Sequence, residues 1–238
     1  MTTRYALGAI PSTEDPRDHQ ISRYAAVPLP AIFLNHVNWT RLNQGLVPAC
    51  IGFSGALDAQ VGTDVIAKDL AVFDGLDLYR QCKLIDGGGT DGTSVRFAIQ
   101  VRMNLGTLAV KAVSGPIKPG QREKITAYAR LRTLADIKTA IVAYGGAWIA
   151  SNWSNSWFTP IAATNTLPKF TTNEGGHGYY FVGYRDDHAN PDGTRGAFLL
   201  QNSWGNSWGH SGRAWYPYSY LTPSIGWEAW RTIPAPVK

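Results

Sequence analysis

The sequence predicts a single domain of the α+β class, mostly helical in its first half and mostly β in its second. Up to residue 145, apolar residues recur at helical spacing in three segments, each with a start or stop signal. Beyond that point, short runs rich in aromatic and branched residues alternate with turn-forming residues, which is typical of strands. We expect a helical lobe over residues 40–118, a β-rich lobe over 119–225 and an N-terminal extension over 1–39. One compact body of mixed structure is the alternative.

The three predicted helices differ in the signals that bound them. The first follows Pro48 and is expected to stop at Gly62, which places Cys50 in its first turn. The second follows a Thr-Ser pair, runs over residues 95–105 and ends at a glycine. The third, over 133–144, opens with a Thr and an Asp at capping-box spacing and stops at a Gly-Gly pair.

The second half is expected to form strands separated by turns. The predicted strands are residues 147–150, 178–184 and 197–201. A glycine-rich stretch at 86–92 reads as a loop, and it lacks the Gly-Lys-Ser/Thr of a phosphate loop. The stretch at 186–193 superficially resembles a calcium loop. His188 and Leu199 would then occupy its first and last ligand positions, so a hairpin turn is favoured.

Composition and charge argue against several classes of function. With 44% apolar and 16% charged residues in 238, the chain can bury one large core or two modest lobes. No apolar run approaches the roughly 20 residues of a membrane helix, and the start lacks the apolar core of a secretory signal. The net charge of +5 is mild and no run of Lys and Arg is present, so we expect neither a nucleic-acid nor a membrane partner.

The chain has only two cysteines, Cys50 and Cys82. Small secreted proteins usually carry more, as a disulfide framework. We therefore expect two free thiols in a reducing compartment, cytoplasmic or inside a particle, with Cys82 a buried structural residue. The alternative, a disulfide between the two, would disable thiolate chemistry.

Four residues, in the chain order Gln44, Cys50, His177 and Asn202, supply the parts of an acyl-transfer site. A helix N-terminus lowers the pKa of a thiol, and a neighbouring imidazolium of His177 lowers it further and then protonates the departing amine. The amide oxygen of Asn202 can orient the imidazole, with Trp204 covering that hydrogen bond. The side-chain amide of Gln44 and the backbone N–H of Cys50 are the natural oxyanion donors.

The sequence around these residues resembles the papain family of cysteine peptidases. Gln44-Gly-Leu-Val-Pro-Ala-Cys50 keeps the family's spacing between glutamine and nucleophile, and His177-Gly-Tyr-Tyr-Phe-Val-Gly-Tyr184 resembles its histidine strand. Leu199-Leu-Gln-Asn-Ser-Trp-Gly-Asn-Ser-Trp-Gly209 resembles the asparagine segment closely. His177 and Asn202 lie 127 and 152 residues after Cys50, against roughly 130–150 in the papain signature. The resemblance covers residues 28–220.

This resemblance implies a papain-like fold: a helical left lobe, an antiparallel β-barrel-like right lobe and an active site in the cleft between them. It implies an endopeptidase that hydrolyses peptides or proteins through a thioester, with no cofactor and no metal. We expect a monomer. It also implies positions that bind substrate, which are Gly88, Gly89, Gly176, Gly178 and Trp204.

The chain departs from the family pattern at three positions near the nucleophile. Val47, Pro48 and Ile51 stand where the family has cysteine, glycine and tryptophan, so a disulfide usual in secreted members cannot form. Pro48 also removes an N–H near the oxyanion region. Only 49 residues precede Cys50, fewer than a long inhibitory pro-segment needs. We therefore expect an enzyme without a pro-segment, made active and controlled by access to its site.

Three alternatives stay open. A specialised amidase or peptidoglycan-crosslink endopeptidase would use the same four residues. A catalytically inactive peptide-binding protein on the same scaffold is favoured by the three departures and opposed by retention of all four site residues. A transglutaminase-like acyl transferase fits less well, because its third residue is normally an aspartate and Asn202 stands here.

Overall fold

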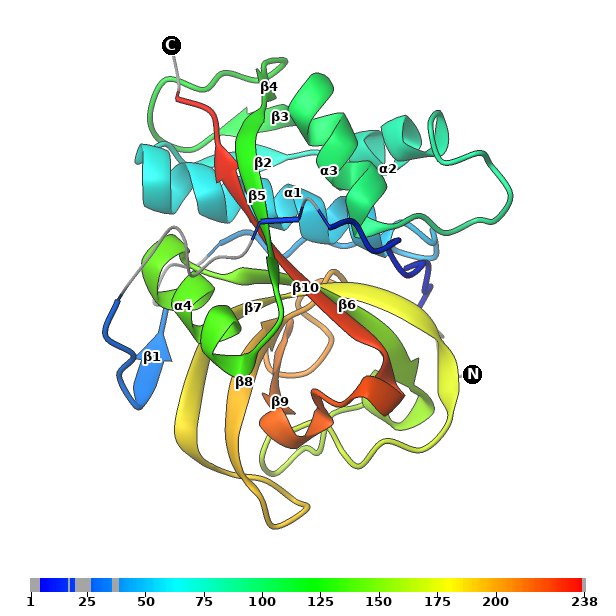
Figure 1. The fold of residues 1–238 in the computed structure, drawn as a ribbon, viewed down its shortest axis with the longest axis vertical. Coiled ribbons are helices and arrows are strands. Elements are labelled where there is room, and N and C mark those ends of the chain that lie inside the picture. The colour runs from blue at the N-terminus through cyan, green and yellow to red at the C-terminus, as the bar shows by residue number, and fades with distance from the viewer. Residues whose placement is uncertain (1–4, 17, 20–26, 36–38, 237–238) are drawn as a thin grey trace.

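The computed structural model describes residues 5–16, 18–19, 27–35 and 39–236, so the predicted extension over residues 1–39 is described only in part. The helices α1 to α3 and a small sheet gather on one side, and a larger sheet forms the other (Figure 1). The helices of the first lobe are α1 (Cys50–Gly62), α2 (Gly75–Lys83) and α3 (Val95–Asn104). The small antiparallel sheet consists of β2 (Ala71–Phe73), β3 (Thr107–Ala112) and β4 (Arg122–Glu123). The predicted α+β class is confirmed.

The second lobe is a seven-stranded antiparallel sheet in the order β5-β10-β6-β7-β8-β9, with β1 paired to β7. Helix α4 (Leu134–Tyr144) packs against β7 and β6. The strands are β1 (Ile32–Leu34), β5 (Ile125–Leu131), β6 (Ala147–Ser154), β7 (Asn173–Ala189), β8 (Arg195–Gln201), β9 (Arg213–Pro217) and β10 (Trp227–Pro234). Among the described strands, β5 and β9 end the path without pairing to each other. The sheet is therefore open, and the predicted barrel-like lobe is only a loose description of it.

Helix α1 begins at Cys50 and its α-helical part ends at Gly62, both as predicted, but the helical path of the chain continues. That glycine keeps helical angles, and a π-helical turn (Thr63–Ala67) carries the chain on to Lys68, whose φ is +56°. A Cβ on Gly62 would lie 3.1 Å from a guanidinium nitrogen of Arg231. Glycine at this position therefore permits close packing against Arg231 of β10.

Burial of α1 goes well beyond the single apolar face that the sequence suggested. Every residue of the helix except Phe53 is buried, because α1 lies between the two lobes. A Cβ on Gly55 would lie 2.7 Å from the ring of Trp148 on β6, and the indole N–H of Trp148 donates to Ser54 Oγ at 2.7 Å. This dense packing holds the first turn of α1, and with it Cys50, in a fixed position.

Helix α2 was not predicted from the sequence. Its cap is Asp74, whose carboxylate accepts the backbone N–H groups of Leu76 and Asp77. Its apolar face is narrow, since the buried residues are only Gly75, Leu78 and Cys82. Such a short face gives little periodic signal.

The other two helices and the strands follow the prediction more closely. Ser94 caps α3, and Thr133 caps α4 in a complete capping box. The predicted strands lie within β6, β7 and β8, and the stretch at 186–193 forms the β7–β8 hairpin. The turn of that hairpin is closed by the Asn190 N–H to Thr194 O bond of 3.0 Å, with Gly193 at φ +81°. Both cysteines are free, buried thiols, as predicted.

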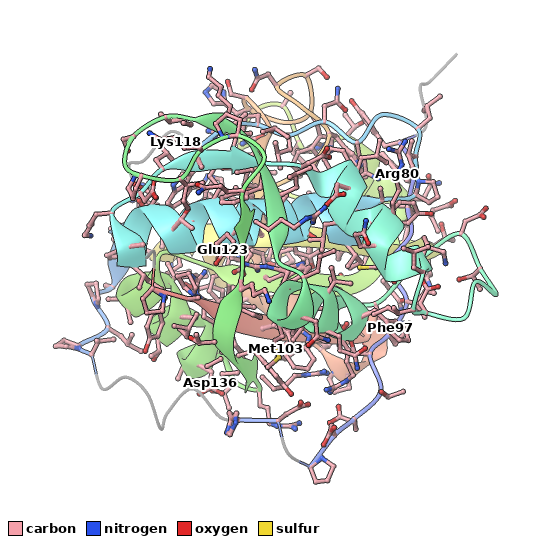
Figure 2. All side chains as sticks on the ribbon, turned by 90° about the horizontal axis from the view of Figure 1, so that it is seen from above. Arg80, Phe97, Met103, Lys118, Glu123 and Asp136 are labelled. Carbon is pink, nitrogen blue, oxygen red and sulfur yellow. The ribbon has the colours of Figure 1, made fainter. Side chains whose placement is uncertain are left out.

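A buried ionic network ties the two lobes together behind the site. Asp58 on α1 accepts hydrogen bonds from Arg102 on α3, from Arg231 on β10 at 2.9 Å and from the Tyr180 hydroxyl at 2.9 Å. Arg102 also pairs with Glu123 at 3.1 Å. Figure 2 shows Glu123 over the middle of the molecule, beside α1. Because each charge is compensated by another, loss of one partner would leave an unpaired buried charge. None of the helices formed by the described residues has the length and apolarity to cross a bilayer.

Candidate active site

The imidazole of His177 is held by Asn202. Nε2 of His177 lies 2.8 Å from Oδ1 of Asn202, and the same oxygen accepts the backbone N–H of Ser203 at 2.8 Å. Because a backbone N–H can only donate, this second bond identifies the atom facing the ring as the oxygen. Nε2 therefore carries the proton, and Nδ1 is the acceptor nitrogen of the neutral ring. Nδ1 is buried and has no hydrogen-bond partner among the described residues.

The sheet explains how residues far apart in the sequence meet here. His177 lies in β7, opposite Ser151 of β6. Asn202 comes directly after the end of β8, which pairs with β7 through Tyr180 and Gln201. The β7–β8 hairpin thus brings the end of β8 beside His177 on β7, and the side chains of His177 and Asn202 meet there.

Cys50 is the first residue of α1, and strand β7 lies against that first turn. A Cβ on Gly178 would be 3.2 Å from Cys50 O and 2.8 Å from Cδ1 of Ile51. The missing side chain of Gly178 therefore lets β7 approach the first turn of α1, at the residue that follows His177. Gly178, which was predicted to border substrate, thus lies against the first turn of α1.

Burial controls the protonation of both groups. It raises the pKa of the Cys50 thiol to about 11, although the backbone N–H groups of Gly178 and Gly8 act in the opposite direction. Burial also lowers the pKa of His177 to about 3, against a smaller opposite effect of the bond to Asn202. In this conformation, the neutral thiol of Cys50 and the neutral imidazole of His177 are the favoured forms at neutral pH.

Gln44 is buried and its side-chain amide is held at both ends. Oε1 accepts from the Ser203 hydroxyl at 2.6 Å, which fixes the amide orientation. Nε2 donates to Val47 O at 2.8 Å and to Ala6 O at 3.2 Å. The turn that follows requires Gly45, whose φ is +59°. The predicted oxyanion donor therefore directs one N–H group at the Val47 carbonyl and the other at the Ala6 carbonyl.

Two tryptophan rings enclose His177. The ring of Trp204 stacks on the imidazole with centroids 4.5 Å apart, and Trp153 stands edge-on at 4.6 Å. Both tryptophans are fully buried. Trp204 was predicted from the sequence to cover the His177–Asn202 bond, whereas Trp153 was not among the predicted site residues. Ser203 was not predicted as a site residue, although it lies in the Asn-Ser-Trp motif and its contacts with Gln44 and Asn202 belong to the same site.

A segment near the start of the chain, Tyr5–Ser12, lies across the site, and we call it the covering segment. Its Gly8 and Ala9 N–H groups both donate to Gly176 O, at 3.0 and 2.9 Å. On its other side, Gly8 O accepts from the Thr93 N–H at 2.9 Å, and the Ile10 N–H donates to Thr93 O at 2.9 Å. The segment therefore bridges the two lobes. Its dark-blue trace follows their boundary in Figure 1.

The glycines that were predicted to bind substrate lie in two different parts of the structure. The Gly176 carbonyl accepts hydrogen bonds from the covering segment, so Gly176 lies beside the backbone of that segment. Gly88 and Gly89 are not brought there: both are exposed, and a Cβ on either would meet nothing within 4 Å. The Asp86 carboxylate holds Gly88 in a separate turn through a 3.0 Å bond. Thr93, a few residues on, is the residue of this stretch that pairs with the backbone of the covering segment.

A cavity of about 340 Å³ opens next to Gly176. One side is formed by the covering segment, up to Ser12, and by Glu14 just after it, and the other by β6 and the start of β10. Its polar groups include Glu228 and Arg130, which pair at 3.0 Å. Among the described residues, no three His, Cys, Asp or Glu side chains gather as they would to hold a metal ion.

Comparison with known proteins identifies the fold. No protein-family model and no curated sequence matches the chain. Among solved structures, it is similar to xylellain, a cysteine protease from Xylella fastidiosa, with a TM-score of 0.76 and 24% identity over 100% of both chains. It is also similar to procathepsin B S9 from Trypanosoma congolense, with a TM-score of 0.70 and 16% identity over 96% of this chain and 83% of that one. Digestive procathepsin L 3 from Tenebrio molitor gives 0.67 and 17%, over 97% and 76%. The chain therefore has the fold of the papain-like cysteine proteases.

Proposed function

We propose that this protein is a cysteine peptidase that hydrolyses peptide bonds through a thioester on Cys50. The observation that carries the proposal is the orientation of His177. Asn202 holds Nε2 and leaves Nδ1 as the acceptor, on a strand that lies against the first turn of the helix that begins at Cys50. A thiol and an oriented base in this arrangement are what nucleophilic catalysis requires.

In the proposed reaction, the Cys50 thiol gives its proton to Nδ1 of His177 and the sulfur attacks the substrate carbonyl carbon. The Gln44 amide and the Cys50 backbone N–H donate to the oxyanion that forms. When this intermediate collapses, the C–N bond breaks and the proton on Nδ1 passes to the leaving amine. Water, deprotonated by the same nitrogen, then attacks the thioester, and the sulfur leaves as a thiol with that proton.

The departures from the family pattern do not remove any of these groups. Pro48 lies outside α1, before its cap residue Ala49, so the proline ring leaves the Cys50 N–H intact. The Val47 carbonyl accepts a hydrogen bond from Gln44 and helps to position the amide. These contacts favour an enzyme over an inactive peptide-binding protein.

Reaction with an epoxysuccinyl thiol reagent near neutral pH, followed by peptide mapping, tests the proposal. We expect labelling at Cys50 and not at Cys82, whose pKa burial raises to about 12. His177→Ala should slow the labelling. His188→Ala is the matched control, because His188 bonds to Thr166 away from the site. Equal labelling of both cysteines, unaffected by His177→Ala, would refute the proposal and favour the inactive binding protein.

A further inference from the structure

Two hydrogen bonds in series join strand β6 to the backbone of the nucleophile. The indole N–H of Trp148 on β6 donates to the Ser54 hydroxyl on α1 at 2.7 Å, and that hydroxyl donates to the backbone carbonyl of Cys50 at 2.7 Å. We propose that Trp148 and Ser54 are positioning residues that act on the Cys50 thiol through these bonds. The inference rests on the proposed role of Cys50 as nucleophile and names residues that tune it.

The last member of the series is a peptide group of α1. The carbonyl of Cys50 and the N–H of Ile51 belong to the same peptide bond. Ile51 lies in the first turn of the helix, where backbone N–H groups have no partner within the helix. Its N–H donates to the Cys50 thiol and lowers the pKa of that group. The series therefore runs from Trp148 through Ser54 and one peptide group to the sulfur, and we call it the hydrogen-bond relay.

All donors of the relay point the same way, toward the sulfur. A hydroxyl that accepts a hydrogen bond is a stronger donor, and a carbonyl that accepts one polarises its peptide group, so that the N–H also becomes a stronger donor. A stronger hydrogen bond to the sulfur favours the thiolate, which is the form that attacks a carbonyl. The relay thus opposes the effect of burial, which raises the pKa of Cys50 to about 11.

The relay is shielded from water and held from both lobes. Trp148 and Cys50 have no exposed surface, and Ser54 is 2% exposed. Hydrogen bonds are electrostatically stronger in such an interior than in water. Trp148 pairs with Tyr180 of β7 on one side and with Trp230 of β10 on the other, so its backbone is fixed within the large sheet.

Two glycines leave room for the relay. A Cβ on Gly55 would lie 2.7 Å from the Trp148 ring, and a Cβ on Gly178 would lie 2.9 Å from Ser54 Oγ. Both distances are shorter than ordinary van der Waals contacts. A side chain at either position would therefore displace a member of the relay, and glycine permits helix and strands to approach closely enough for the bonds to form.

Ser54 differs from an ordinary helical serine. Bonding back to the carbonyl four residues earlier is common for Ser and Thr in helices, and it needs no function. Thr63 makes such a bond to Ala59 O at 3.0 Å, just beyond the other end of α1. Ser54 has in addition a donor from the other lobe, Trp148, and its acceptor is the peptide group that faces the thiol. Thr63 is therefore the matched comparison for a test.

The first test measures how the labelling rate of Cys50 by iodoacetamide depends on pH, with peptide mapping. In Ser54→Ala, we expect the profile to move to higher pH and the rate at neutral pH to fall about threefold to tenfold, because less thiolate is present. Thr63→Val removes the hydroxyl that makes the similar backward bond and should keep the profile of the unmodified protein. Labelling of Cys82 in the same samples should change in neither variant. Thermal unfolding shows that each variant retains the fold.

The second test asks whether Trp148 acts through Ser54. Trp148→Phe keeps an aromatic ring but removes the N–H, so it should move the profile in the same direction by a smaller amount. Added to Ser54→Ala, it should move the profile no further, although it should still lower the Tm. Residues that act independently would give additive shifts. Trp39→Phe is the control, because it removes an N–H that donates to Asp64 at 2.8 Å and has no part in the relay.

An unchanged profile in Ser54→Ala would overturn the inference for both residues. Equal shifts from Trp148→Phe with and without the Ser54 hydroxyl would overturn it for Trp148. If His177→Ala leaves the labelling of Cys50 unchanged, the proposed function fails instead. The comparison of Ser54→Ala with Thr63→Val still decides the role of the relay in that case, because it reports the ionisation of the thiol alone.

Discussion

The ring of Trp204 stacks on the ring of His177, with centroids 4.5 Å apart and an interplanar angle of 26°. The indole thus covers the imidazole whose Nε2 is bonded to Asn202. We predict that Trp204→Ala lowers kcat/KM on a peptide substrate by about 100-fold, because water enters and the imidazole loses its fixed orientation. Trp204→Phe, which keeps a stacked ring, should lose much less. Equal losses in the two variants, measured across a pH series, would contradict a role for the stacking.

Ser203 should matter for catalysis although it touches neither the thiol nor the imidazole. Its hydroxyl donates to Oε1 of Gln44 at 2.6 Å and so points the amide N–H groups toward the oxyanion position. In Ser203→Ala, we expect kcat to fall about tenfold with little change in KM, because oxyanion donors act mainly in the transition state. Ser203→Thr, which keeps a hydroxyl, should restore part of the rate. A change confined to KM would show that Ser203 serves binding instead.

Gly178 should tolerate no side chain, because β7 touches α1 at this point. In Gly178→Ala, the new methyl group would meet Cδ1 of Ile51 at 2.8 Å and Ser54 Oγ at 2.9 Å. We expect a loss of about 1–3 kcal/mol in the free energy of unfolding and a large loss of Cys50 labelling, since His177 shifts away from the thiol. Ile51→Val removes Cδ1, so the double variant should recover part of both. Urea unfolding and labelling kinetics measure the two effects; no recovery in the double variant would contradict this account.

Glu123 should make stability depend on pH. Burial raises its pKa from 4.5 to about 7 in the folded protein, although Arg102 acts in the opposite direction. The folded state therefore binds this proton more tightly than the unfolded state, and the associated stability is lost as pH rises from about 4.5 to about 7. Glu123→Gln has no proton to lose, so over this range its free energy of unfolding should rise relative to the unmodified protein by up to about 3 kcal/mol.

Urea unfolding at several pH values measures this difference. Glu174→Gln, at an exposed position of β7, is the control and should follow the unmodified protein. If the free energy of unfolding changed with pH in parallel for Glu123→Gln and the unmodified protein, Glu123 would be ionised throughout and compensated by the guanidinium groups around it.

Local sequence signals located most of the elements that carry the site. Helix α4 was predicted from Thr133 and Asp136 because a capping box is formed within one turn of chain, and Cys50 was placed at the start of a helix from the apolar spacing that follows it. Helix α2 was missed because its buried face holds few residues. The predicted end of α1 at Gly62 was confirmed, but the π-helical turn that continues the chain over Thr63–Ala67 was not predicted.

The sequence by itself determined the fold class, the order of the chemical groups and the family resemblance, because these depend on short-range spacing and on motifs contiguous in the chain. Only the tertiary structure decided that Ser203 orients Gln44, that Gly178 packs on α1 while Gly88 and Gly89 lie apart, and that Gly8 fits against Pro48. Each of these contacts joins segments brought together by strand pairing and burial. A fit of a few tenths of an ångström between such segments depends on the whole packed core, and no local pattern of residues encodes it.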